Sequence, residues 1–179
     1  MVWFWYFLIY SFLGFLVEVA YVRLVGGVKR DRKCRLVLPI CPVYGLGALA
    51  ILLLPPLVRD SLPLLFPAAL VCTAVEYVTG LFYEKVFRVS FWDYSHLPLN
   101  LGGRVCLLFA LFWGVLALLV LHVIHPTAAW LAARIPLWAF PPAVLATALD
   151  TLLTARLLRR TGDPNSLRWY ARLPRRRPA

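Results

Sequence analysis

Long uncharged runs of mostly apolar residues constrain this chain more than any other feature. A helix needs about 20 apolar residues to cross roughly 30 Å of hydrocarbon at about 1.5 Å per residue. Five uncharged runs occur, at 1–17, 36–58, 62–75, 105–124 and 135–149. In the first, third and fifth, the helical pattern continues past an acidic residue, at Glu18, Glu76 and Asp150. We therefore expect five transmembrane helices, at 1–22, 36–58, 62–87, 105–124 and 135–158.

The composition agrees with a membrane protein. Hydrophobic residues make up 62% of the 179 residues and charged residues 15%, whereas soluble domains average about 45–50% and about 25%. Five helices leave no room for a soluble catalytic domain. The first run has no basic segment before it and no small-residue cleavage site, so we interpret it as a retained helix rather than a signal peptide. The expected fold is all-α and polytopic, with a transmembrane domain at 1–158 and a basic tail at 159–179.

The basic residues predict the orientation. Of 19 Lys and Arg, 17 fall in the first and third connections and in the tail, which leaves Arg59 and Arg134 in the other loops. The positive-inside rule then places the N-terminus outside and the C-terminus in the cytoplasm, in a multi-pass protein of the inner membrane. Because the tail follows the last helix, we expect its arginines to contact anionic lipid headgroups rather than nucleic acid.

Four acidic residues fall within or near the predicted helices, in the inner half of the bilayer or near its middle: Glu18, Glu76, Glu84 and Asp150. A charge at the centre of a membrane helix costs roughly 2.5–3.5 kcal/mol, so such residues usually face a bundle interior or a wet cavity. Each lies on a stripe of small or hydroxylated residues at helical spacing. The pattern favours one shared cavity open to the cytoplasm. The alternative is that the acids only hold helices together, paired with Arg23, Lys85, Arg104 or Arg156.

Two connections have more specific patterns than ordinary linkers. The entry to the second helix is rich in proline and glycine and predicts an irregular, fixed backbone that lines a cavity or is buried; its marked residues are Pro39, Cys41, Pro42, Tyr44 and Gly45. The connection before the fourth helix places aromatic and polar groups at the expected cavity mouth, namely Trp92, Asp93, Tyr94, Ser95, Asn100 and Arg104. Ser95 or Asn100 could instead serve as a helix cap. The pair Pro141-Pro142 predicts a kink in the fifth helix.

These motifs resemble the ABC-transporter type IV membrane family, also called the CmpB-type permease family. The resemblance covers about residues 10 to 115 and rests on Gly14-Phe15-Leu16-Val17-Glu18, Pro39 to Gly45, Glu76-Tyr77, Glu84-Lys85, Trp92 to Ser95, Asn100 to Leu107 and Trp113-Gly114. It implies a permease subunit with no assigned substrate. The chain departs from the family in the lead-in to the Cys-Pro motif, where it has Asp31-Arg32-Lys33-Cys34-Arg35.

Other chemistry has little support in the sequence. The four cysteines contain no C-x-x-C pair, and the three histidines are scattered, so we expect neither a disulfide nor a metal site. No cofactor is implied. Since the chain has no G-x-x-x-x-G-K-[ST] motif, ATP would be bound by a separate subunit.

Three hypotheses remain open. The leading one is a permease-like subunit in which Glu18, Glu76 and Glu84 bind a cation or protons, with Asp93 and Arg104 at the cavity mouth. The second is an integral-membrane enzyme acting on a lipid or lipid-linked substrate, with Asp93 and a glutamate as acid and base. The third is a non-transporting scaffold. Five helices are few for a transport path, which leaves room for a homodimer.

Overall fold

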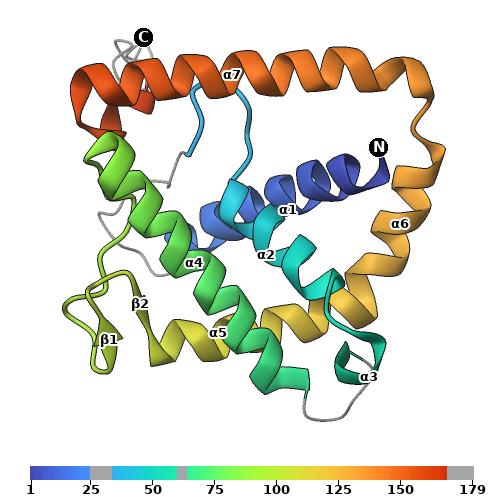
Figure 1. Cartoon of the computed structure of the whole chain (residues 1–179), viewed down its shortest axis with the longest axis horizontal. Coiled ribbons are helices and arrows are strands. Elements are labelled where there is room, and N and C mark those ends of the chain that lie inside the picture. Colours follow the sequence, from blue (N-terminus) through green and yellow to red (C-terminus); the bar gives the residue numbers. More distant parts are fainter. Residues whose placement is uncertain (25–33, 60–63, 169–179) are drawn as a thin grey trace, which may run out of the picture.

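A computed structural model describes residues 1–24, 34–59 and 64–168 (Figure 1). Several predictions concern residues outside these ranges: the basic residues at 29–33 with the lead-in to the Cys-Pro motif, and the tail beyond residue 168. Within the described ranges the chain is mostly helical, with one pair of two-residue strands.

Among the described residues, four helices are long and apolar enough to cross a membrane. They are α1 (Val2–Leu24), α4 (Leu65–Phe87), the continuous helix formed by α5 (Leu107–Leu119), η2 (Val120–Ile124) and α6 (His125–Arg134), and α7 (Phe140–Thr161) with the short η3 (Leu137–Ala139) before it. Large apolar side chains on these helices, such as Leu70, Val78 and Leu145, are exposed on the outside of the bundle. The prediction of an all-α membrane fold is confirmed at this level.

The expected second helix is shorter than 36–58. It consists of α2 (Pro42–Leu52, 11 residues) and the four-residue α3 (Pro56–Arg59). At about 1.5 Å per residue, α2 covers roughly 17 Å, about half of a hydrocarbon core. Proline disfavours a helical conformation in the residue before it and cannot donate within a helix, so Pro39 and Pro42 delay the start of α2.

The segment before α2 is not helical, and α7 satisfies part of its backbone. The N–H of Val37 donates to Asp150 Oδ1 at 2.8 Å, and the N–H of Leu36 donates to Thr154 Oγ1 at 3.0 Å. The guanidinium of Arg35 donates to Thr151 Oγ1 at 2.7 Å. An unpaired peptide group is costly in an apolar environment. The polar face of α7 therefore has a structural use, which is to bind this extended segment.

The expected fourth helix ends later than residue 124. It continues to Arg134 through the five-residue π-helix η2, where the His125 N–H donates to the Val120 oxygen. Proline removes one backbone donor, and a wider turn lets a helix continue past it in lipid. Pro126 lies two residues after the end of η2, in the first turn of α6, and the helix continues past it to Arg134.

The predicted kink in the fifth helix is wrong. Pro141 and Pro142 lie in the first turn of α7, which begins at Phe140 after η3. The first N–H groups of a helix have no intrahelical acceptor, so proline costs little there and supplies a suitable φ angle. The prolines start the helix rather than bend it.

The body of the bundle is formed by helices α1, α2, α4, α5 and α6. Helix α2 lies between α1 and α4, while α5 packs along α4 and α6 packs against α1. Their shared core includes Tyr10, Ile51, Leu64, Cys72 and Ala117. Helix α7 lies along one edge of the molecule (Figure 1). A smaller cluster joins its end to the end of α4 through Leu158, Val89 and Tyr83.

A short hairpin connects α4 to α5. Strands β1 (Asn100–Leu101) and β2 (Val105–Cys106) pair antiparallel, with Leu101 opposite Val105. The turn uses Gly102 and Gly103, whose φ angles of 58° and 69° are in the left-handed region. In Figure 1 this hairpin lies at the same end of the bundle as the C-terminal ends of α1, α4 and α7. The 3-10 helix η4 (Pro164–Leu167) follows α7.

Candidate binding cavity

Two buried carboxylates from different helices line one cavity. Helix α1 supplies Glu18 and α4 supplies Glu76, whose residues are 5% and 4% exposed. The cavity has a volume of about 320 Å³, within the roughly 300–1,000 Å³ typical of small-molecule sites. Its lining also includes aromatic residues, namely Tyr21, Tyr44, Trp92, Tyr94, Phe109, Phe112 and Trp113.

Neutral side-chain donors hydrogen-bond both carboxylates. The Tyr44 hydroxyl donates to Glu18 Oε1 at 3.0 Å. The Tyr94 hydroxyl donates to Glu76 Oε1 at 3.1 Å, and the Trp113 indole N–H donates to Glu76 Oε2 at 2.9 Å. Hydrogen bonds of this kind offset part of the cost of burying a carboxylate. They also bring residues of α1, α2, α4 and α5 and of the hairpin loop together at one place.

Aromatic rings line the cavity in two groups of contacting side chains. The rings of Tyr44 and Trp113 lie 4.9 Å apart between centroids, and Tyr94 stacks on Phe109 at 4.5 Å. Tyr21 of α1 meets Phe109 edge-on at 6.3 Å. The face of an aromatic ring carries negative potential and attracts cations. Carboxylates and ring faces therefore act in the same direction, and both favour a positively charged occupant.

A glycine in α1 makes this arrangement sterically possible. A Cβ atom at Gly14 would lie 2.2 Å from Tyr44 Cγ, closer than any real contact. Without that Cβ, the Tyr44 ring lies directly against α1. Glu18 is one turn further along the same face of α1, which places its carboxylate within reach of the Tyr44 hydroxyl. Because Gly14 and Glu18 are one turn apart, the Tyr44 ring can pack on the first while its hydroxyl binds the second.

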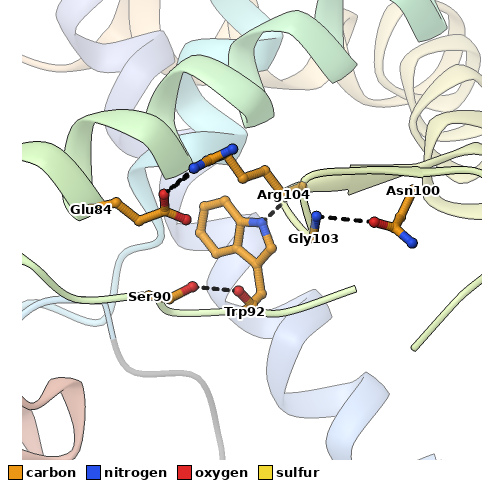
Figure 2. A network of polar contacts seen from close by, with 6 residues as sticks. All are labelled: Glu84, Ser90, Trp92, Asn100, Gly103 and Arg104. Atoms are coloured by element: carbon orange, nitrogen blue, oxygen red, sulfur yellow. Dashed lines mark hydrogen bonds and ion pairs between the residues drawn. The ribbon is translucent and has the colours of Figure 1, made fainter. Parts of the chain in front are cut away.

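A network in the connection between α4 and α5 holds Trp92 over the cavity (Figure 2). The Trp92 indole N–H donates to the Arg104 carbonyl oxygen at 2.7 Å, while Arg104 Nε donates to Glu84 Oε2 at 2.9 Å. This ion pair is partly exposed, at 23% for the Arg104 side chain and 30% for Glu84. The hydrogen bond that Arg104 donates to Glu84 raises the pKa of Arg104. Glu84 and Arg104 lie outside the cavity lining and position the loop that closes it.

The other polar residues of this connection bind the loop itself. Asp93 accepts from the backbone N–H and the hydroxyl of Ser95, at 2.9 and 3.0 Å. Asn100 accepts from the Gly103 N–H at 3.1 Å and donates to the Leu97 oxygen at 2.8 Å. Hydrogen bonds of this kind between a side chain and the nearby backbone stabilise turns. Asp93 and Asn100 therefore stabilise the conformation of the loop.

The proline-rich entry fixes the start of α2 against α1. The Cys41 N–H donates to the Ser11 oxygen at 2.8 Å, and Pro42 occupies the first turn of α2. A Cβ at Gly45 would lie 2.2 Å from Ser11 Oγ. Pro39 lies in the extended segment before it. The entry therefore sets the position of Tyr44, the residue through which α2 contacts Glu18.

The structure brings some of the sequence-predicted site residues together and separates others. Glu18, Glu76, Tyr44 and Tyr94 line the cavity, and Trp92, which the sequence analysis assigned to the loop structure, lines it as well. Glu84, Asp93, Asn100 and Arg104 lie in the surrounding loop network. Asp150, expected in the same cavity, binds the Val37 N–H instead.

Sequence reasoning missed two features. The first is Trp113, which the sequence analysis named only as part of the family motif, although its indole N–H donates to Glu76. An indole N–H in a membrane helix needs a hydrogen-bond acceptor, so the sequence could have predicted that Trp113 binds a buried acid. The second feature is the cysteine pair Cys34 and Cys41, buried with their sulfur atoms 3.0 Å apart. Their separation of seven residues gave no recognisable motif.

A smaller apolar hollow of about 50 Å³ adjoins the cavity. It follows α1 towards Tyr10, and it follows α5 and η2 towards Ile124. Four residues line both spaces: Val17, Tyr44, Trp113 and Leu116. The rings of Tyr44 and Trp113 therefore lie, with these two aliphatic side chains, at the boundary of the acid-lined cavity and the apolar hollow.

Fold and site together define a helical membrane protein with an acid-lined internal cavity. Its sequence matches, over residues 5–155, the model of the family described as "Putative ABC-transporter type IV", and the chain belongs to this family. Comparisons with curated proteins and with solved structures found no match. Within the described ranges, no three His, Cys, Asp or Glu side chains are grouped so that they could hold a metal ion.

Proposed function

We propose that this chain is a permease-like membrane subunit of a transporter, and that the cavity between α1, α2, α4 and α5 binds a cationic group. The observation that carries the proposal is the convergence of Glu18 and Glu76 on one aromatic-walled cavity. Two carboxylates buried inside a membrane protein raise its folding free energy, so a purely structural role does not account for both of them. A bound cation would offset that cost and so give the two acids a use.

Membership of the family supports a transport role. A separate ATP-binding subunit would supply the energy, because the chain has no phosphate-binding loop motif. Translocation would carry the cation past Tyr44 and Trp113, which lie at the boundary of the cavity and the adjoining apolar hollow. Movement of these two rings would join the spaces, so we assign them the role of an internal gate.

The proposed orientation has the hairpin end of the bundle in the cytoplasm and the chain in the inner membrane. Arg23 in the last turn of α1, Arg88 at the C-terminal end of α4 and Arg104 in the hairpin turn lie at this end, where the positive-inside rule places the cytoplasm. The second of five crossings would then consist of the extended segment at 34–41, α2 and α3. Interrupted crossings of this kind are common where transporters bind their substrates, near the middle of the bilayer.

An enzyme acting on a lipid is the second candidate function. The observation in its favour is that exposed apolar side chains such as Phe112 and Val115 also line the cavity, which gives lipid access to it. Deletion of the protein would then change the lipid profile of the membrane, whereas loss of a permease need not.

The test uses the complex purified from native membranes through a tag on this chain. We expect an ATP-binding subunit to co-purify and its ATPase rate to rise with tetramethylammonium chloride. Glu18→Gln and Glu76→Gln should remove this stimulation, while Asp150→Asn, a buried acid outside the cavity, should keep it. Co-purification of no ATPase, together with wild-type behaviour of both glutamine variants in cells, would overturn the proposal and favour a scaffold.

A further inference from the structure

The cavity is polar on its buried side and apolar on its exposed side. Glu18 and Glu76 are almost fully buried, whereas five other lining residues have exposed fractions between 42% and 58%: Val17, Tyr21, Phe112, Val115 and Leu119. The first two belong to α1 and the other three to α5. A cavity lined by residues that are also exposed on two membrane helices opens sideways, between those helices, into the hydrocarbon.

This gradient constrains the shape of a ligand. A cationic head would be held at the carboxylates, and any attached apolar chain would contact Phe112, Val115 and Leu119 on its way to the lipid. Removal of CH₂ groups from water is favourable, so a chain along this path should raise the affinity of the head at least tenfold. A small, strongly hydrated inorganic cation would leave this side of the cavity unused.

The lining of the cavity constrains the chemistry of the head. Apart from Glu18 and Glu76 it consists of aromatic and aliphatic side chains, with seven aromatic residues among them. A primary ammonium group has three N–H donors that are best satisfied by several polar acceptors at fixed positions. A quaternary ammonium group has none. It is recognised by charge and by aromatic faces, which is the established use of aromatic cages.

We propose that the cavity binds a quaternary ammonium head group carrying one apolar chain, with the head between Glu18 and Glu76 and the chain leaving between α1 and α5. This inference rests on the proposed function in that both use the same two carboxylates, and it adds the substrate class and the route of entry. The ligand could be a free amphiphilic cation or a choline lipid, which share this chemistry.

The test compares three ligands on the purified full-length chain in dodecyl maltoside, by isothermal titration calorimetry against protein-free micelles. The ligands are dodecyltrimethylammonium below its critical micelle concentration, tetramethylammonium and lysophosphatidylcholine. We expect dodecyltrimethylammonium to bind at least tenfold more tightly than tetramethylammonium, and Glu76→Gln or Glu18→Gln to weaken both at least tenfold. Lysophosphatidylcholine binding through the same glutamates would identify a lipid source, and its failure to bind would identify a free amphiphile.

A variant at the opening separates the chain path from the head site. Val115→Trp fills the space between α1 and α5 and should weaken dodecyltrimethylammonium binding at least tenfold more than tetramethylammonium binding. The matched control is Val78→Trp, because Val78 is 62% exposed on α4 and does not line the cavity. This control should bind both ligands as the wild type does.

Two different results would overturn two different claims. If tetramethylammonium binds through Glu76 and the dodecyl chain adds no affinity, the inference fails and the cation-binding function stands. If neither ammonium ion binds to a monodisperse protein, the cation cavity of the proposed function fails with it.

Discussion

Among the described residues, buried acids occur in two regions, and their carboxylates have different partners in each. Asp150 of α7 is 3% exposed and accepts from a backbone N–H, that of Val37. Glu18 and Glu76 are equally buried but bind side chains, and they line a cavity. The backbone N–H of Val37 is fixed by the chain and needs Asp150 as its acceptor, whereas the side chains of tyrosine and tryptophan can rotate away from an acid when a ligand binds. The difference indicates that burial alone does not identify a functional acid, and that its partner and the adjoining space do.

The largest expected effect comes from filling the space beside Gly14 that the Tyr44 ring occupies. Gly14→Ala places a Cβ 2.2 Å from Tyr44 Cγ, so the ring must leave α1 and give up its bond to Glu18. We expect a loss of stability of about 3 kcal/mol, the upper part of the range for overpacking. Thermal unfolding of the purified protein measures it.

The control for that substitution is Gly47→Ala on α2. Its Cβ would meet Cys72 Sγ at 3.7 Å, which is ordinary contact, and alanine favours helix over glycine by up to about 1 kcal/mol. Equal destabilisation by both variants would show that the Tyr44 contact has no special role.

The next effect tests the α7 region. Asp150→Ala leaves the Val37 N–H without its acceptor and should cost about 1–3 kcal/mol, because the hydrogen bond to the carboxylate is lost next to lipid. Asp150→Asn retains an acceptor oxygen and should be close to wild type, since Asp150 Oδ2 has no hydrogen-bond partner to lose. A large loss from the asparagine variant would mean that the negative charge itself matters there, which would remove the contrast with the cavity.

The cavity acids should give the opposite pattern. In Glu76→Gln the new amide can accept from Trp113 and donate to the oxygen of Tyr94, so we expect the unfolding free energy to change by less than about 1 kcal/mol. Binding of tetramethylammonium, measured by calorimetry, should nevertheless fall at least tenfold. If stability falls and binding remains, Glu76 is a structural acid like Asp150.

The smallest effect is expected at the partly exposed pair of the loop. Arg104→Gln removes the ion pair with Glu84 but leaves the Arg104 carbonyl, which is what accepts from Trp92. We expect a slight fall in the unfolding temperature that disappears in high salt, because exposed charges are screened. A fall that persists in high salt would show that the pair holds the loop over the cavity by more than its charge.

The sequence predicted the helical class and most helix positions, since apolar length is a local property. The prediction failed where the conformation of a segment depends on residues far away in the sequence. The backbone of Leu36 and Val37 can remain extended because Asp150 and Thr154 accept hydrogen bonds from it. The sequence around residue 36 contains no signal for these two acceptors. Helical spacing placed Glu18 and Glu76 on polar faces, but which face meets which depends on how the helices pack. Asp150 had the same local signature and a different use for that reason.

The contact between α7 and the extended segment also has a consequence for biogenesis. Val37 and Asp150 are 113 residues apart in the chain, and a ribosome releases the N-terminal partner first. Until α7 enters the bilayer, the peptide groups before α2 lack the acceptors they have in the finished protein. Insertion of α7 would then be the step that completes the assembly, and a chain stalled before it would be recognisable to quality-control proteases by this exposed backbone.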